Sequence, residues 1–295
     1  RRHARVHTTL PPFRNRLGGH VSRPMSDRSC REIWAGGQFI DGSYTNHAGT
    51  RTYKLYIPRG YRGQALPLVV MLHGCTQTPD DFAAGTRMNV FAEREQFLVV
   101  YPEQALLANQ SKCWNWFQMT DQYRGHGEPS IIAGITNQIV RTYHLNARRV
   151  YVVGLSAGGA MAAIMGVTYP DLYAGIGVHS GLAYGAAHDL PSAFPAMLQG
   201  KTTPRQWDSG LRNTGTSTRV VPTIVFHRDQ DTTVHPYNGD QVLAQWASTN
   251  ARRGPIAGSN LRVTVNVGQV PDGHAYTQSI YHDENGHGVM EQWLI

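Results

Sequence analysis

Short apolar runs alternate with segments of helical spacing along most of the chain. Six runs rich in β-branched and aromatic residues predict strands, at 52–57, 68–72, 97–101, 150–153, 176–180 and 221–226. Residues 52–57 alternate as an edge strand does, and 276–281 and 289–295 flank a hairpin-turn signal at 283–286. Apolar residues at helical spacing predict helices over 82–91, 131–143 and 160–167. This order predicts an α/β fold, with a mostly parallel central sheet and helices on both faces.

The positive charge of the chain is concentrated at its start. Residues 1–31 hold eight arginines and one acid, whereas the rest of the chain carries 19 basic and 19 acidic residues. A neutral body argues against nucleic acid as the main partner, because phosphate binding needs a concentrated basic face. We expect 1–34 to be a basic, flexible tail and 35–295 to be the α/β domain. The tail has no signal-peptide apolar core, and no apolar run in the chain is as long as a membrane span.

The pentapeptide Gly154-Leu-Ser-Ala-Gly158 has the Gly-x-Ser-x-Gly pattern, and its surroundings support that match. A predicted buried strand ends just before it, and a helix of small residues follows. Strand, sharp turn and helix are the context of a nucleophile elbow, in which Ser156 is the nucleophile. Glycines allow the strand and the helix to approach closely, so that the serine can occupy a strained backbone position. The Ala157 N–H would then help to bind an oxyanion at the helix N-terminus.

A serine nucleophile needs a histidine base, and the histidine needs an acid that fixes its tautomer. The acid is expected after the strand at 221–226, where Asp229 and Asp231 both occur, and we prefer Asp231 because it begins an Asp-x-x-Val-x-Pro turn. His274, His282 and His287 all precede the last predicted strand, so the triad histidine is expected beyond Ile295. We therefore expect the domain to be truncated at its C-terminus.

The loop after the second predicted strand, His73-Gly74-Cys75, is the expected place for a second oxyanion donor, the Cys75 N–H. Cys75 and Cys113 are the expected disulfide pair, with Cys30 left over; three reduced thiols are the alternative. The expected disulfide favours a secreted or periplasmic protein over a cytoplasmic one.

Other polar and aromatic residues near these motifs have two interpretations. The aromatic run that includes Trp114 and Trp116 could fill the core or form the wall of an ester pocket. His73 and His179 are also expected at the pocket, although either could have a structural role. Ser180 lacks an elbow and is not expected to be a nucleophile. The segment 282–287 contains possible metal ligands, but a solvated turn is the preferred interpretation, and no metal is expected.

Together these motifs resemble those of the esterase/polyhydroxybutyrate depolymerase family. The resemblance spans residues 35–295 and rests on segments that occur in the same order, at 72–78, 80–89, 100–104, 113–117, 154–161, 177–182 and 231–236. It implies an α/β-hydrolase fold and a serine esterase without cofactor or metal. Ser156 would be the nucleophile, Asp231 the acid, and Cys75 and Ala157 the oxyanion donors. Family members place the triad histidine in a Gly-His-Ala-Trp-like segment directly after the last hairpin.

The resemblance leaves the substrate open. The first expectation is hydrolysis of poly(3-hydroxybutyrate) or its oligomers through an acyl-enzyme, and the alternative is a feruloyl or acetyl esterase acting on plant polysaccharide esters. A hydrolase-like binding module without catalysis is the alternative from another class.

Overall fold

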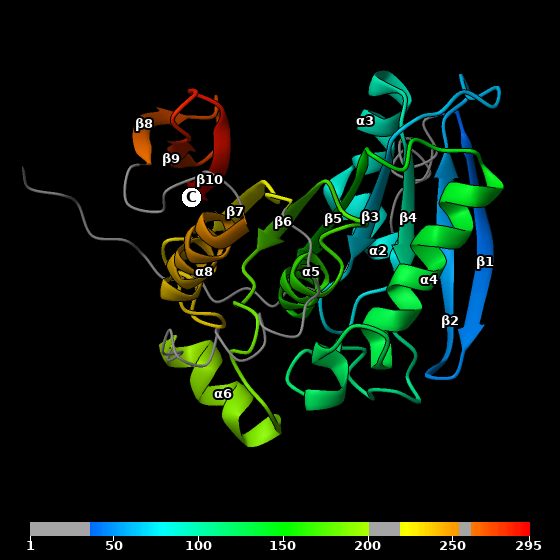
Figure 1. The fold of residues 1–295 in the computed structure, drawn as a ribbon, viewed down its shortest axis with the longest axis horizontal. Helices are drawn as coiled ribbons and strands as arrows, with labels where there is room; N and C mark the ends of the chain where they lie inside the picture. The colour runs from blue at the N-terminus through cyan, green and yellow to red at the C-terminus, as the bar shows by residue number, and fades with distance from the viewer. Residues whose placement is uncertain (1–35, 201–218, 254–260) are drawn as a thin grey trace, which may run out of the picture.

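The computed structural model describes residues 36–200, 219–253 and 261–295, so the expected tail and Cys30 lie outside the described part. The described residues form one ten-stranded sheet in the order β1-β2-β4-β3-β5-β6-β7-β10-β9-β8 (Figure 1). The strands are β1 (Gln38–Asn46), β2 (Gly49–Ile57), β3 (Leu68–Leu72), β4 (Leu98–Pro102), β5 (Val150–Leu155), β6 (Gly175–His179), β7 (Thr223–His227), β8 (Arg262–Gln269), β9 (Ala275–His282) and β10 (Gly288–Leu294).

The middle of the sheet is parallel and its two ends are antiparallel. Strands β4, β3, β5, β6, β7 and β10 run in the same direction. The β1–β2 hairpin joins β4 antiparallel at one end, and the β9–β8 pair joins β10 antiparallel at the other. The carboxyl ends of the parallel strands therefore meet at one edge, where α/β proteins build their sites.

Helices cover both faces of the sheet, as the sequence predicts. On one face, helices α4 (Gly127–Thr142), α5 (Ala157–Thr168) and α8 (Tyr237–Arg253) pack over β2, β5, β6, β7 and β10 (Figure 1). On the other face, α2 (Pro79–Thr86) and α3 (Met88–Glu95) pack against β2 and β4. The two buried apolar clusters lie on these two faces. Helix α6 (Leu190–Gln199) and the short 3-10 helix η1 (Met119–Gln122) belong to the connections between these elements.

Three predictions about the elements need correction. Strand β2, which contains 52–57, is not an edge strand, because β1 pairs along its whole length. The helix predicted over 82–91 is two helices, since Arg87 adopts a left-handed conformation with φ 53° and ends α2. Strands β1 and β8 and helices α6 and α8 were not predicted.

Among the described residues, no helix covers the second face beyond α3. A groove of about 500 Å³ lies there over β5, β6 and β7, and Val69, Tyr151, Val153 and Ile224 are among its lining residues. Its lining also includes Gly175 and Gly288, which begin their strands, and lacks the residues that follow the carboxyl ends of β3 and β5. This groove is therefore separate from the edge formed by the carboxyl ends of the parallel strands. Among the described residues, no helix is both long and apolar enough to span a membrane.

Candidate active site

Ser156 occupies the sharp turn between β5 and α5 that the pentapeptide predicts. Its backbone has φ 55° and ψ −118°, a region that residues with a side chain rarely adopt. A β-carbon at Gly154 would collide with the Gly158 carbonyl, and one at Gly158 would collide with the Leu72 carbonyl. The two glycines are thus required by close backbone contacts, and the turn has the geometry of a nucleophile elbow.

Backbone hydrogen bonds hold this turn from both sides. The Ser156 N–H donates to the His179 carbonyl at 2.8 Å, and the Ser156 carbonyl accepts from the Ala160 N–H at 3.0 Å. The side chain is only partly buried, and its hydroxyl forms no hydrogen bond with any residue in the described ranges. Ala157 begins helix α5, where the first N–H groups lack partners within the helix. The elbow therefore presents a hydroxyl beside a backbone donor.

The loop after β3 packs directly against the elbow. A β-carbon added at Gly74 would lie 3.6 Å from the Ser156 Cβ. His73 holds this loop: its Nε2 accepts from the Gln104 N–H at 3.0 Å, so its Nδ1 carries the proton and donates to the Gly74 carbonyl at 2.7 Å. Because the peptide is planar and trans, the Cys75 N–H points away from the carbonyl that His73 binds. Among the described residues this N–H has no hydrogen-bond acceptor.

His73 is neutral as well as fixed. Burial lowers the pKa of its imidazole, and the contact of Nδ1 with the Gly74 carbonyl opposes that shift only in part. A neutral ring is what the hydrogen bonds require, since a protonated Nε2 could not accept from Gln104. The ring also lies 5.6 Å from that of Trp114, centroid to centroid.

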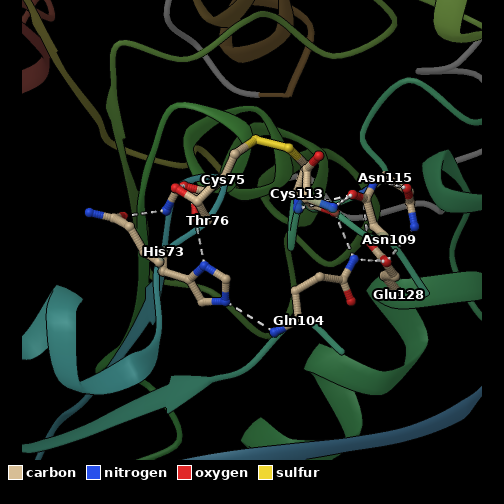
Figure 2. The surroundings of a disulfide bond; sticks show 11 residues. His73, Cys75, Thr76, Gln104, Asn109, Cys113, Asn115 and Glu128 are labelled. Carbon is tan, nitrogen blue, oxygen red and sulfur yellow. Dashed lines mark hydrogen bonds between the residues drawn. A yellow bond between two sulfur atoms is a disulfide. The ribbon is translucent and has the colours of Figure 1, made fainter. Parts of the chain in front are cut away.

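The predicted disulfide between Cys75 and Cys113 is present (Figure 2). It joins the loop after β3 to the loop after β4, with a Cα–Cα distance of 4.1 Å. A hydrogen bond from the Thr76 N–H to the Ser111 carbonyl, at 2.7 Å, runs beside it. The residue expected to donate to an oxyanion is thus covalently anchored.

A buried polar network lies behind the disulfide and was not predicted from the sequence. The Glu128 carboxylate accepts from the Asn115 N–H at 2.7 Å, from Arg51 Nη2 at 3.3 Å and from the Gln104 side-chain amide (Figure 2). The Gln104 amide also donates to the Cys113 carbonyl at 2.8 Å. Gln104 therefore connects Glu128 to both the disulfide and His73.

Glu128 is a strongly perturbed acid. Burial raises the pKa of its carboxyl to about 7 and the nearby Asp121 adds to the shift, while Gln104, Asn115 and Arg51 oppose it. Its only sequence signal is a position beside Pro129 in the first turn of α4, which does not reveal partners as distant as Arg51.

The acid loop follows β7, where the sequence places it. Asp231 Oδ1 accepts from the Thr233 and Val234 N–H groups, both at 2.9 Å, and the nearby Ser180 hydroxyl also favours the ionised carboxylate and so lowers its pKa. Burial opposes ionisation of Asp231, but these hydrogen bonds together with His227 lower the pKa of the carboxyl below its usual value. The alternative, Asp229, is exposed.

Two histidines lie near Asp231, and they differ in accessibility. His227 is fully buried, and its Nε2 bonds to the Val234 carbonyl at 2.8 Å and lies 3.7 Å from Asp231 Oδ2, which is typical of a structural residue. His179 ends β6, is exposed, and packs edge-on against Phe226 at 6.1 Å. Desolvation by its neighbours lowers the pKa of His179; His227 adds to this and Asp231 opposes it.

The end of strand β10 runs beside the acid loop. The Ile295 N–H donates to the His227 carbonyl, and the Ile295 carbonyl accepts from the Asp229 N–H, both at 2.9 Å. Ile295 is therefore held next to the loop that carries Asp231.

Other expected site residues have different roles. Trp114 is 0% and Trp116 5% exposed, and His73 is 1% exposed, so these three side chains are enclosed and do not line an open pocket. This burial in the main apolar cluster supports the core-filling interpretation of the aromatic run. The segment 282–287 is a turn in which Asp283 accepts from the Asn285 and His287 N–H groups. No group of three potential metal ligands occurs among the described residues.

The elbow, the acid after β7 and the mixed sheet define an α/β-hydrolase. The solved structure of an acetyl xylan esterase from Aspergillus awamori matches this fold with a TM-score of 0.71 at 22% identity, over 86% of this chain and 92% of that one. Residues 51–260 match the family described as "Esterase PHB depolymerase", and the chain belongs to this family.

Relatives within the family carry different names. Poly(3-hydroxyalkanoate) depolymerase C of Paucimonas lemoignei is 32% identical over 85% of this chain and 58% of its own length. Feruloyl esterase B of Neurospora crassa is 30% identical over 73% of each chain. The chain thus spans little more than half of the depolymerase that it resembles.

The buried network yields a prediction about stability. Replacing Glu128 by Ala removes the buried acceptor of Arg51 Nη2 and of the Asn115 N–H, so Glu128→Ala should lower the free energy of unfolding by about 3–5 kcal/mol in urea titrations. The matched control is Glu95→Ala, which removes an exposed ion pair with Arg94 and should change it by less than about 1 kcal/mol. Equal effects of the two substitutions would contradict a supporting role for the network.

Proposed function

We propose that the chain is a serine carboxylester hydrolase that cleaves poly(3-hydroxybutyrate) or its oligomers through an acyl-enzyme. The observation that carries this proposal is the strained Ser156 elbow, with the Gly74–Cys75 loop packed against it. The ionised Asp231 after β7 supports the same reaction class. Family membership supports ester hydrolysis independently of the geometry.

In the proposed reaction the Ser156 hydroxyl attacks the ester carbonyl while a histidine removes its proton. The Cys75 and Ala157 N–H groups donate to the oxyanion of the tetrahedral intermediate. The intermediate collapses as the histidine protonates the leaving alcohol, which gives a Ser156 acyl ester. Water, deprotonated by the same histidine, then attacks the acyl ester, releases the acid and restores Ser156. No metal or cofactor takes part in these steps.

The base in this proposal is a histidine that follows Ile295 in the protein. The position of Ile295 supports it, since both backbone groups of this residue bond to the acid loop. Residues that continue from there would start beside Asp231, whose carboxylate can fix an imidazole tautomer. His179 is the competing candidate because it is accessible and neutral, but no hydrogen bond joins its ring to Ser156. We propose that His179 instead lines the ester pocket.

The substrate proposal follows the names of relatives. Similarity to a poly(3-hydroxyalkanoate) depolymerase over most of this chain supports a 3-hydroxyalkanoate ester. Similarity to a feruloyl esterase supports the second candidate, an ester of a plant polysaccharide. The disulfide that anchors Cys75 supports an oxidising compartment, so we propose that the protein is secreted or periplasmic.

A substrate comparison tests the proposal. Hydrolysis of a 3-hydroxybutyrate trimer and of methyl ferulate should be measured for the protein that includes the residues following Ile295. The trimer should be cleaved, and Ser156→Ala should lower kcat by at least about 10³-fold, because the acyl-enzyme cannot form. Cleavage of ferulate alone would favour the second candidate. Absence of Ser156-dependent cleavage of either ester would favour a binding module.

A separate experiment on residues 1–295 tests whether His179 is the base. Added imidazole should raise Ser156-dependent hydrolysis of an activated ester, because a free base can occupy the position beside Asp231. His179→Gln should leave the imidazole-dependent rate within a few-fold of the unsubstituted value. A rate that needs no imidazole and disappears in His179→Gln would instead identify His179 as the base.

A further inference from the structure

Helix α6 exposes a continuous apolar face. Leu190, Phe194 and Leu198, at successive intervals of four residues, are 53%, 59% and 56% exposed. The two prolines beside them, Pro191 and Pro195, are exposed as well. Single exposed apolar residues are ordinary on a protein surface, but a contiguous set marks a place where something binds.

The same helix is firmly attached through its other face. Ala193 and Ala196 are buried, and Met197 packs against the main apolar cluster. Asp189 caps the helix in a capping box with Ser192, which fixes its first turn. The exposed face therefore belongs to an ordered, anchored helix.

The apolar face carries no charge, which limits what it can bind. None of the ten residues of α6 is charged, and Asp189 lies at the cap before the helix. Anionic lipid and charged peptides would find no complementary group on this face. An uncharged, water-insoluble ligand can bind to this face without a charged partner, because the burial of apolar surface drives such binding.

Helix α6 is also joined to the acid loop. The Met197 carbonyl accepts from the His235 N–H at 2.8 Å and from Asn238 Nδ2 at 3.0 Å. Both donors follow Asp231 closely in the chain, and α6 lies below α8 in Figure 1. Tyr237, which starts α8, is 51% exposed as well. The helix that carries this face is thus attached to the segment that follows Asp231.

We propose that the exposed face of α6, formed by Leu190, Pro191, Phe194, Pro195 and Leu198, docks the protein on the surface of a solid aliphatic polyester. The proposal rests on the proposed function and adds to it how an insoluble substrate is held near Ser156. Alkyl segments of the polyester pack against the leucines and Phe194, and the neutral ester groups require no charged partner.

Adsorption to poly(3-hydroxybutyrate) particles, measured in Ser156→Ala so that no polymer is consumed, tests this surface. Combined replacement of Leu190, Phe194 and Leu198 by Ser should weaken adsorption at least about tenfold, since three apolar contacts are lost. The matched control replaces Val265 and Val267 by Ser; these residues of β8 are 58% and 78% exposed and should not matter. Phe194→Leu keeps an apolar side chain and should retain adsorption within about threefold.

The outcomes separate this surface from the proposed function. With Ser156 restored, the Ser variant should hydrolyse the soluble trimer as the unsubstituted protein does, and its thermal midpoint should be unchanged. Unaltered adsorption in the α6 variant, or an equal loss in the β8 control, would overturn the docking surface. Stronger binding to anionic vesicles than to polyester would also overturn the docking surface.

Adsorption through α6 without any trimer hydrolysis would retain the docking surface and reject the catalytic proposal. If the triple variant does not fold, Phe194→Ser alone should weaken adsorption about threefold, and no change would overturn the surface.

Discussion

The proposed chemistry depends on one strained residue, Ser156, whose backbone is held at φ 55° and ψ −118°. A conformation of this kind costs about 1–3 kcal/mol and persists only where the surroundings enforce it. Here the enforcement comes from the tight approach of β5, α5 and the end of β3, which the glycines at 154 and 158 permit. The same approach brings the Gly74–Cys75 loop against the turn at Ser156, so one packing constraint positions both the proposed nucleophile and the proposed backbone donor.

Hydrogen bonds, a disulfide and a buried polar network together hold the loop that carries Cys75. The neutral His73 fixes the direction of the Gly74 carbonyl and hence that of the next N–H. The disulfide ties Cys75 to the neighbouring loop, and Gln104 links that loop and His73 to the buried Glu128. Donors aimed in advance at a developing charge lose little energy to reorganisation during a reaction. A network distant from the substrate therefore contributes to the geometry of the site.

The sequence predicts the parts of the fold whose signal is local. Buried parallel strands such as β3 and β5 and the elbow at Ser156 are visible because burial or a tight turn dictates their residue types. Strands β1 and β8 are edge strands that are mostly exposed, so they lack the run of buried apolar residues by which the central strands are recognised. Arg87 breaks a helix in a left-handed conformation without a glycine to reveal it. The Glu128 network joins residues more than 70 positions apart, so no local pattern could show it.

The central claim is that Ser156 is an activated nucleophile, and active-site labelling tests it most directly. Residues 1–295 should be treated with a fluorophosphonate in the presence of imidazole, and the modified peptide identified by mass spectrometry. The account predicts one adduct, on Ser156, whose formation is slowed when Asp231 is replaced by Asn. Absence of labelling, or an adduct on Ser180 in place of Ser156, would contradict the account.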